Sequence, residues 1–423
     1  MAIKSISIKS LPTRIALAAA VLLCLVGVVF ALRWCAGNAI SANTVYLEIA
    51  DLAISLAPSD PQTHYTAAVL HERTFQPNDL IESLAEYEQS TALSPNDFRT
   101  WLALGKARER GGDAAGAERA LRKSLELAPN YSDVRWILGN VLLRRGKRQE
   151  AFAELRAAAE SDSKFVNPTV STAWQVFGGD LAQINQYLGD STSIKAALIS
   201  FLAREKRFDE AAEIWKTLPA AEKKTTFREN GGVLAAQLIE AKKYRDASRV
   251  LAQIADADAE QFAVGKIFNG GFETDVKTVG VSLFEWQIQE GGQPQIGIDD
   301  SQKHGGQRSL VAVFDSATGR DFRAVSQLVA VEPGKKYTFE MFYKSDLKTG
   351  TTFNWQVVSV PEGKILATTP AISAVSDWTN LRTEFVVPEK MEAVVIGLAR
   401  ETCKSTLCPI SGRVWFDDLA LNQ

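Results

Sequence analysis

Acidic residues in the second half of the chain are the first candidates for chemistry, because enzymes that cleave glycosidic bonds use two carboxyl groups at a set separation. The acids considered for that role are Glu273, Glu285, Asp299, Asp300 and Asp321. Nothing in the sequence holds any two of them at a catalytic separation. Acids spread over a domain usually serve its solubility, so we expect a protein that is not an enzyme, with a carbohydrate-active enzyme as the minor alternative.

The histidine content and the net charge argue against two further classes of function, histidine-based catalysis or metal binding and nucleic-acid binding. The chain has three histidines, His64, His71 and His304, which limits histidine-based catalysis or metal binding. Its 423 residues carry a formal net charge of -3, with a sequence pI near 5.9. Nucleic-acid-binding proteins normally present a clustered basic surface. We therefore expect no nucleic-acid partner.

The cysteines point to one possible disulfide. Cys403 and Cys408 flank a short Lys-Ser-Thr-Leu loop, and in an oxidising compartment they could close a small disulfide loop. The alternative is two free thiols that do not meet. The spacing and the lack of His or Cys partners nearby exclude a CxxC-type metal site. Cys24 lies inside an apolar run, and Cys35 lies just beyond it.

That apolar run is a candidate membrane segment. Residues Ile15–Leu32 form 18 consecutive residues without a charged or strongly polar side chain. As a helix, such a run spans about 27 Å, which is close to the thickness of the hydrocarbon core of a bilayer. We therefore expect a transmembrane anchor at 15–33 that tethers the chain to the cytoplasmic membrane.

Basic residues near the run predict its orientation. Lys4, Lys9 and Arg14 precede it, whereas Arg33 alone follows closely. Because Lys and Arg favour the cytoplasmic side, we expect a cytoplasmic tail at 1–14 and a periplasmic or extracytoplasmic location for the rest. The alternative is a cleaved signal peptide, whose apolar region is shorter and is followed by small residues, where this chain has Arg33 and Trp34.

The elements that follow show an internal repeat. Five pairs of identical residues are each 34 residues apart: Pro95 and Pro129, Leu104 and Leu138, Gly105 and Gly139, Ala117 and Ala151, and Leu121 and Leu155. A fixed period of this size is typical of stacked helix-turn-helix units. The small residues matter because two antiparallel helices approach closely only where side chains are short.

Helical periodicity extends from about Asn43 to Asp258, with breaks at Pro- and Asn-containing segments. We expect a helical repeat domain at 41–260 built from roughly five hairpins. A degenerate repeat should precede the two good ones, with its period disturbed by about three residues near Gln76. After Ser163 the repeat decays, but two further hairpins of similar size are expected.

The unit between Trp101 and Pro129 resembles the tetratricopeptide repeat, because it keeps most of that pattern in order. It departs at Arg108, where the family usually has a large aromatic residue. The next unit has Arg135 where the family has Trp. The resemblance implies an all-α solenoid whose repeats bind a protein partner.

From Gln261 the composition changes to Gly, Thr, Val and aromatic residues. Alternating segments such as Lys336–Tyr343 lie between turn clusters such as Glu332-Pro333-Gly334. Short alternating strands between turns are typical of a β-sandwich. We therefore expect an all-β jelly-roll sandwich at 262–423.

The motifs of this domain occur in an order similar to that of carbohydrate-binding modules with the galactose-binding-like jelly roll. They are Asn269–Glu273, Trp286, Gly306–Leu310, Val331–Tyr337, Trp378 and Val414–Leu419. In that family a structural calcium commonly lies near the opening Gly-Phe-Glu and the closing Asp. The resemblance implies Glu273 and Asp417 as calcium ligands, with Asp418 as the alternate, and calcium suits such hard oxygen ligands.

Sugar binding needs exposed aromatic faces beside hydrogen-bonding side chains. The candidates for such a surface are Tyr343, Trp355 and Arg323. Strand alternation places Trp355 and Gln356 on opposite faces, so both cannot line one surface. If Trp355 belongs to the core, the ligand surface moves to Asn354 and Gln356. Trp286, Trp378 and Trp415 are expected in the core.

Taken together, an anchor, a solenoid and a binding-type sandwich without a catalytic signature suggest a membrane-anchored scaffold. We expect the repeats to hold a protein partner and the sandwich to bind a glycan, as in bacterial envelope or exopolysaccharide assembly. The alternative is a structural protein whose sandwich mediates protein–protein contact or self-association.

Overall fold

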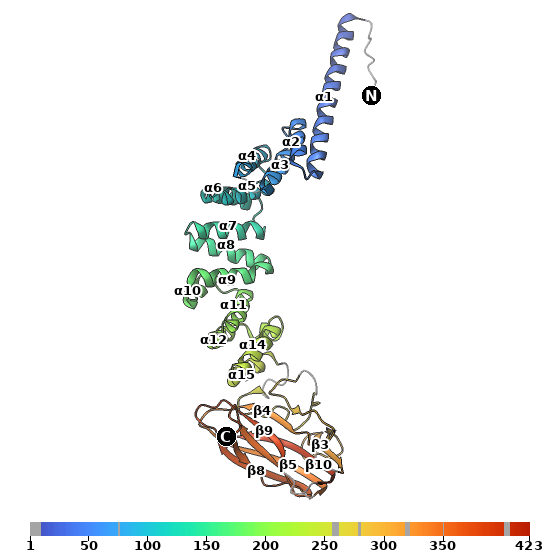
Figure 1. The fold of residues 1–423 in the computed structure, drawn as a ribbon, viewed down its shortest axis with the longest axis vertical. Coiled ribbons are helices and arrows are strands. Elements are labelled where there is room, and N and C mark those ends of the chain that lie inside the picture. The colour runs from blue at the N-terminus through green and yellow to red at the C-terminus, as the bar shows by residue number, and fades with distance from the viewer. Residues whose placement is uncertain are drawn as a thin grey trace, which may run out of the picture. The chain divides into compact units, whose positions relative to one another are not determined.

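The computed structural model describes residues 10–74, 77–255, 262–277, 281–317, 322–349, 351–401 and 407–423. The chain divides into two compact units, Met1–Ile194 and Lys195–Gln423. Of the residues named in the sequence analysis, those outside the described residues are Lys4, Lys9, Gln76, Asp258, Gln261, Asp321 and Cys403. Helices precede strands along the chain, as expected (Figure 1).

The first unit is helical. Its elements are α1 (Leu11–Asn43), α2 (Leu47–Leu56), α3 (Pro61–Thr74), α4 (Pro77–Leu93), α5 (Phe98–Arg110), α6 (Ala114–Leu127), α7 (Ser132–Arg144), α8 (Arg148–Ser161), a 3-10 turn η1 (Ser163–Phe165), α9 (Val166–Phe177) and α10 (Leu181–Leu188). Helix α11 (Thr192–Arg204) crosses the boundary between the units. The second unit continues with α12 (Phe208–Lys216), α13 (Ala220–Lys224), α14 (Arg228–Glu240) and α15 (Tyr244–Ile254).

Close helix pairing explains the 34-residue period. In the hairpin of α5 and α6, a β-carbon added to Gly105 would lie 2.6 Å from Cγ of Leu121. In the hairpin of α7 and α8, one added to Gly139 would lie 2.8 Å from Cγ of Leu155. Any side chain at these two glycines would therefore force the helices apart. The predicted pairing through small residues is confirmed, with leucine as the closest partner.

A second contact recurs in three successive hairpins, those that begin with α3, α5 and α7. The indole N–H of Trp101 donates to the carbonyl of Pro95 at 2.8 Å, and Nε of Arg135 donates to the carbonyl of Pro129 at 3.0 Å. Nε2 of His64 lies 2.9 Å from the carbonyl of Pro58. Each donor lies six residues after its proline, so arginine and histidine take the place of the indole.

The spacing of these contacts confirms the degenerate first repeat. His64 precedes Trp101 by 37 residues, three more than the period between Trp101 and Arg135. The sequence placed the disturbance near Gln76, which lies outside the described residues.

The later hairpins share one turn geometry with the earlier ones. A backbone N–H five residues after the acceptor closes each turn, in the pairs Asp113–Arg108, Lys147–Leu142, Arg207–Leu202 and Lys243–Leu238. The residue before each donor has positive φ: Gly112, Gly146, Lys206 and Lys242. Repeats therefore continue beyond Ser163, although their residue pattern has decayed.

Helix α1 contains the apolar run and continues past it. It has 33 residues, and by length and composition it could cross a membrane. A signal sequence near the N-terminus would meet the same two criteria. Its last turns pack within the first unit, where a β-carbon on Gly37 would lie 2.6 Å from Cβ of Ala57. Nδ2 of Asn38 donates to Asp60 at 2.7 Å. The expected boundary between the anchor and the repeat domain is thus crossed by one continuous helix.

The sandwich consists of two five-stranded antiparallel sheets. The strands are β1 (Gln287–Ile288), β2 (Gln295–Asp299), β3 (Ser309–Ser316), β4 (Val325–Ala330), β5 (Lys336–Thr349), β6 (Phe353–Ser359), β7 (Ile365–Thr368), β8 (Val375–Val386), β9 (Ala393–Arg400) and β10 (Ile410–Asn422). One sheet has the order β1-β4-β9-β6-β7, and the other has the order β2-β3-β10-β5-β8. Alternate residues of both sheets fill a single apolar core between them.

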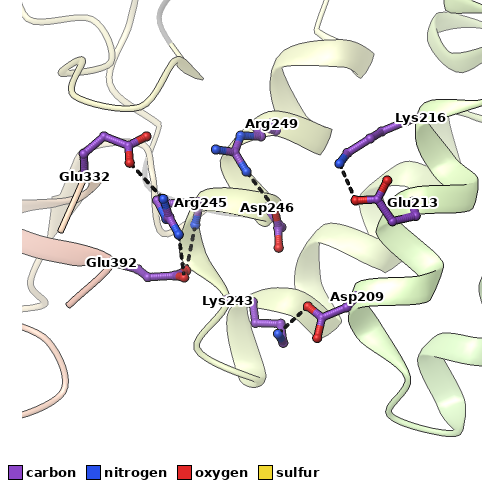
Figure 2. Close-up of polar contacts among 9 residues, drawn as sticks. All are labelled: Asp209, Glu213, Lys216, Lys243, Arg245, Asp246, Arg249, Glu332 and Glu392. Atoms are coloured by element: carbon purple, nitrogen blue, oxygen red, sulfur yellow. Dashed lines mark hydrogen bonds and ion pairs between the residues drawn. The ribbon is translucent and has the colours of Figure 1, made fainter. Parts of the chain in front are cut away.

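Within the second unit, an arginine joins the last repeat helix to the sandwich. Arg245, at the start of α15, donates to Glu332 at 2.8 Å and to Glu392 at 3.3 Å (Figure 2). The pKa of Arg245 is raised, because these two carboxylates outweigh the opposing effect of burial. Lys243 pairs with Asp209 at 2.5 Å and ties α15 to α12.

Candidate functional site

The acids predicted to bind calcium meet at one loop, residues 304–308. Asp417 on β10 is fully buried, and its Oδ2 accepts hydrogen bonds from the backbone N–H groups of His304 and Gly305 at 2.8 and 3.0 Å. Oε1 of Glu273 accepts from the backbone of Gln307 at 2.8 Å and of Arg308 at 3.3 Å. The structure therefore brings the two acids, 144 positions apart in the sequence, to a common loop.

Irregular backbone conformations determine where the side chains of these acids point. The pairing of β10 with β5 shifts register between Asp417 and Ala420, and Asp418 has a φ of 50°. Phe272, beside Glu273, has a φ of 52°. Positive φ is uncommon for non-glycine residues and is found where surrounding structure imposes it. The bulge places successive acids, Asp417 and Asp418, on the same side of the loop.

The residue types of this cluster suit calcium, but no set of carboxylate oxygens, one from each of the three acids, lies within 4.8 Å of one another. A β-carbon added to Gly271 would lie 3.7 Å from Oδ1 of Asp418 and 4.0 Å from Oδ1 of Asp417. Burial raises the pKa of Asp417, although three backbone N–H groups oppose that effect. A nearby cation would favour the ionised form of such a carboxyl group. The residues that would hold the ion are Glu273, Asp417 and Asp418, which supply hard oxygen ligands.

Two of the predicted sugar-contacting residues are in the core, so that part of the prediction is wrong. Trp355 has 0% exposure and packs against Trp286 and Phe416, with ring centroids 5.9 and 5.3 Å away. Tyr343 is 2% exposed, and its hydroxyl accepts a hydrogen bond from the backbone of Ser373. Both rings lie on the inward faces of their strands. The strand alternation that made them candidates for one face places that face against the opposite sheet.

Arg323, the third candidate, is half-buried at the start of β4. Its Nε donates to the carbonyl of Gln289 at 2.9 Å, and its backbone N–H donates to Gln293. A side chain that already holds the segment before β2 has a structural role here.

The opposite face of β6 carries a polar row. Five residues stand in register across one sheet, one from each strand: Thr368, Gln356, Gly397, Ser326 and Gln287. All five are at least partly exposed, and they alternate with core residues such as Trp355 and Val357. We call these residues the polar row. Gly397 at its centre has no side chain, so the row is lowest there.

Asn354 lies beside the polar row on the same face of β6. It is 6% exposed, and its Oδ1 has no hydrogen-bond partner within the part of the chain that the structure describes. A buried acceptor without a partner is costly. The sequence analysis named Asn354 and Gln356 as the fallback ligand surface. Gln356 is partly exposed but Asn354 is buried, and ligand binding on this face stays a prediction.

A second surface was missed by the sequence analysis. The rings of His304 and Phe342 stack with centroids 3.6 Å apart, and Trp378 lies 5.8 Å from His304. Trp378 is only half-buried, contrary to expectation, whereas Trp286 and Trp415 are buried. The outward register of Phe342 on β5 was visible in the alternation, but the approach of His304 depends on the loop.

Cysteine placement agrees with part of the prediction. Cys408 is buried and disulfide-bonded, whereas Cys24 and Cys35 are free. Cys403 lies outside the described residues, so its pairing with Cys408 stays a prediction.

No family model matches the chain. It is 32% identical over 95 residues to the BBSome complex member bbs-4 of Caenorhabditis elegans, and this match covers 22% of the chain and 19% of that protein. The chain thus spans about a fifth of the length of this curated relative.

Similar solved structures fall into two groups. A CBM4 structure is 17% identical, covers 37% of this chain and 99% of its own, and has a TM-score of 0.29. YrrB, a TPR protein with an unusual peptide-binding site, is 18% identical, covers 35% of this chain and 79% of its own, and has a TM-score of 0.28. The two groups match the two kinds of architecture described above, repeat helices and a sandwich. Scores this low carry no functional conclusion.

Proposed function

We propose that this chain is a membrane-anchored binding protein whose sandwich holds a glycan on the polar row. The observation that carries the proposal is the in-register line of polar residues on either side of Gly397, although Nε2 of Gln287 already donates to the carbonyls of Ser282 and Glu285. Sugar hydroxyls need such donors and acceptors, and a low centre lets a flat ring approach the sheet.

The helical repeats are proposed to bind a protein partner. Stacked helical hairpins form extended surfaces that commonly take a peptide or helix. The start of α3 and the segment that leads into α5 supply a small pocket lined by Gln62, Tyr65, Asp97 and Arg99, among others. Its mixture of an aromatic ring with charged and amide groups suits an extended peptide.

Membrane anchoring through α1 is proposed from its composition and from its neighbour α2. The outer side of this corner exposes Val45, Tyr46, Ile49 and Leu52. Arg33, directly after the apolar run, donates to the carbonyl of Ser55 at 3.0 Å. This contact brings the end of α2 level with the end of the run, so Leu52, the exposed apolar residue nearest that end, would lie closest to the interfacial region of a bilayer. We place the solenoid and sandwich on the extracytoplasmic side, in an envelope or exopolysaccharide assembly role.

Binding rather than catalysis is favoured by how the acids are used. Oε1 of Glu285 pairs with Lys277 at 2.9 Å, and Oδ2 of Asp299 accepts from the indole of Trp415 at 2.7 Å. Acids committed to such contacts are poor candidates for a freely titrating pair.

The test is a glycan array probed with the full chain in detergent. Gln356→Ala should abolish the signal, because it removes the donor and acceptor next to Gly397 without touching the core. The control is Trp378→Ala on the other sheet, which should leave binding unchanged. Loss of signal in Trp378→Ala alone would move the site to the His304, Phe342 and Trp378 surface.

Self-association is the second candidate function, favoured by the edge strand β8. This strand is 12 residues long, borders its sheet, and exposes Val375 and Val386. Long exposed edges can pair with another chain. Light scattering that shows concentration-dependent dimers, with no glycan signal on the array, would support this alternative.

A further inference from the structure

Helices α3 and α4 bring one histidine and two carboxylates together near the connection between them. The residues are His71 on α3 and Asp79 and Glu82 on α4. One ligand-type atom from each lies within 4.8 Å of the other two. Asp79 and Glu82 are three residues apart, so both project from the same side of their helix toward α3.

The histidine is buried and lacks a hydrogen bond at the nitrogen that faces the acids. His71 is 8% exposed, and its Nδ1 is inaccessible to solvent and has no hydrogen-bond partner. That nitrogen lies 3.3 Å from Oε2 of Glu82 and 3.8 Å from Oδ1 of Asp79. It is therefore aimed at both carboxylates but makes a hydrogen bond with neither.

The other histidine of α3, His64, forms hydrogen bonds through both ring nitrogens. Nδ1 of His64 lies 2.5 Å from Oε2 of Glu86, and its Nε2 lies 2.9 Å from the carbonyl of Pro58. Both ring nitrogens of His64 are thus engaged. The same pair of helices holds one histidine by direct hydrogen bonds and leaves the other with a gap between its nitrogen and two acids.

The two separations between the histidine nitrogen and the acids match those in a metal centre. Four ligands placed about 2.1 Å from a tetrahedral zinc ion lie about 3.4 Å from one another. The observed separations of 3.3 and 3.8 Å bracket that value, whereas a direct hydrogen bond would be shorter. The Thr74 hydroxyl donates to Oδ2 of Asp79, so Oδ1 is the oxygen left facing His71. Such outer contacts orient ligating carboxylates in metal sites.

We propose that His71, Asp79 and Glu82 bind a zinc ion, with water as the fourth ligand, and that the ion fastens α3 to α4. Imidazole with two carboxylates suits zinc, whereas calcium and magnesium take oxygen ligands. The side chain of Glu82 is 61% exposed, so the fourth position faces solvent and is open to water. This inference does not depend on glycan binding or on membrane anchoring.

The test is calorimetric titration of zinc chloride into the full chain in detergent, after chelation and with calcium present to occupy any site in the sandwich. The wild type should bind one equivalent of zinc. Glu82→Gln should weaken that affinity at least ~10-fold, as should His71→Gln, because each removes one ligand. Glu82→Gln changes an exposed side chain, so its fold should be intact, and its circular dichroism without metal checks this.

The matched control is Glu86→Gln, one turn further along α4, where the carboxylate faces His64. It should leave the zinc affinity unchanged. A second readout is cobalt substitution, which should give the intense visible absorption of a tetrahedral ion in the wild type and lose it in Glu82→Gln. Absence of zinc binding in the wild type would overturn the proposal, and so would equal affinities in all three variants.

Discussion

At the scale of single residues, the same hydrogen bond recurs in successive repeats although the residue that donates it differs. Trp101, Arg135 and His64 all donate to the carbonyl of a proline six residues earlier. From the sequence, Arg135 looked like a departure from the repeat, because a pattern of residue types does not show which atom a side chain uses. The burial of Trp355 was equally open, since alternation divides a strand into two faces without saying which is the core.

Glu118 supplies a pH-dependent contact between repeats. Its side chain is buried and accepts hydrogen bonds from Arg122, Arg145 and Lys147. Burial disfavours the charge, but the hydrogen bonds from Lys147 and Arg122 outweigh it and lower the pKa of Glu118 from 4.5 to about 2. Its stabilisation is therefore complete above the unfolded-state pKa and is lost as the pH falls from about 4.5 to about 2.

We predict that Glu118→Gln lowers the free energy of unfolding of the repeats at pH 7 by about 1–3 kcal/mol, because charged hydrogen bonds are removed. Below pH 2 the difference from wild type should vanish. Chemical denaturation of the full chain, followed by helical circular dichroism, measures both. A difference that stays constant from pH 7 to pH 2 would contradict the assigned pKa.

A calcium-dependent stability is predicted for the sandwich. An ion that binds the folded chain alone adds about 2.7 kcal/mol at a hundredfold excess over its dissociation constant. Chelation should lower the melting temperature of the sandwich transition, and Glu273→Gln should remove that response. Glu285→Gln, an acid paired with Lys277 instead, serves as the control. A response that persists in Glu273→Gln would place the ion elsewhere.

At the scale of elements, the 34-residue period reflects the positions where paired helices approach closely. The sequence predicted α5 to α8 well, because glycine, alanine and leucine recur where the helices touch. It predicted the later hairpins from periodicity alone, since there the turn is kept by Lys206 and Lys242 in place of glycine. The continuity of α1 was not predicted, because Gly37 and Ser41 become informative only once Ala57 and Thr66 are seen beside them.

Gly105→Leu should destabilise the repeats by about 1–3 kcal/mol, the usual cost of overpacking. The added side chain would start 2.6 Å from Cγ of Leu121, and in a nearest-neighbour stack the damage should reach the adjacent hairpins. Gly111→Ala is the control, since its nearest neighbour would be 3.5 Å away and its φ is -72°. Equal thermal unfolding of wild type and Gly105→Leu would refute the pairing.

At the scale of the whole molecule, the proposed function rests on which side of a membrane the proposed binding surfaces lie. In the sandwich, Glu273 and Asp417 were named from an ordered set of motifs, and the structure brings them to one loop, whereas their binding of an ion stays a prediction. The polar row was not predicted as a row, since it depends on the pairing of five strands whose order is not readable from the sequence. The helical and β regions themselves were predictable, because their periodicities differ.

The last prediction concerns topology. With Lys4, Lys9 and Arg14 before the apolar run, a C-terminal reporter that is active only after export should work, and one that needs the cytoplasm should not. Mass spectrometry of the exported chain should find residues 1–32 retained, which separates an anchor from a cleaved signal. Leu23→Arg, at the centre of the run, should reduce membrane integration, because arginine there costs about 2.5–3.5 kcal/mol on the insertion scale. Leu23→Ile is the matched control and should integrate normally. The reverse reporter pattern would overturn the orientation and, with it, the oxidising compartment on which the predicted pairing of Cys403 with Cys408 depends.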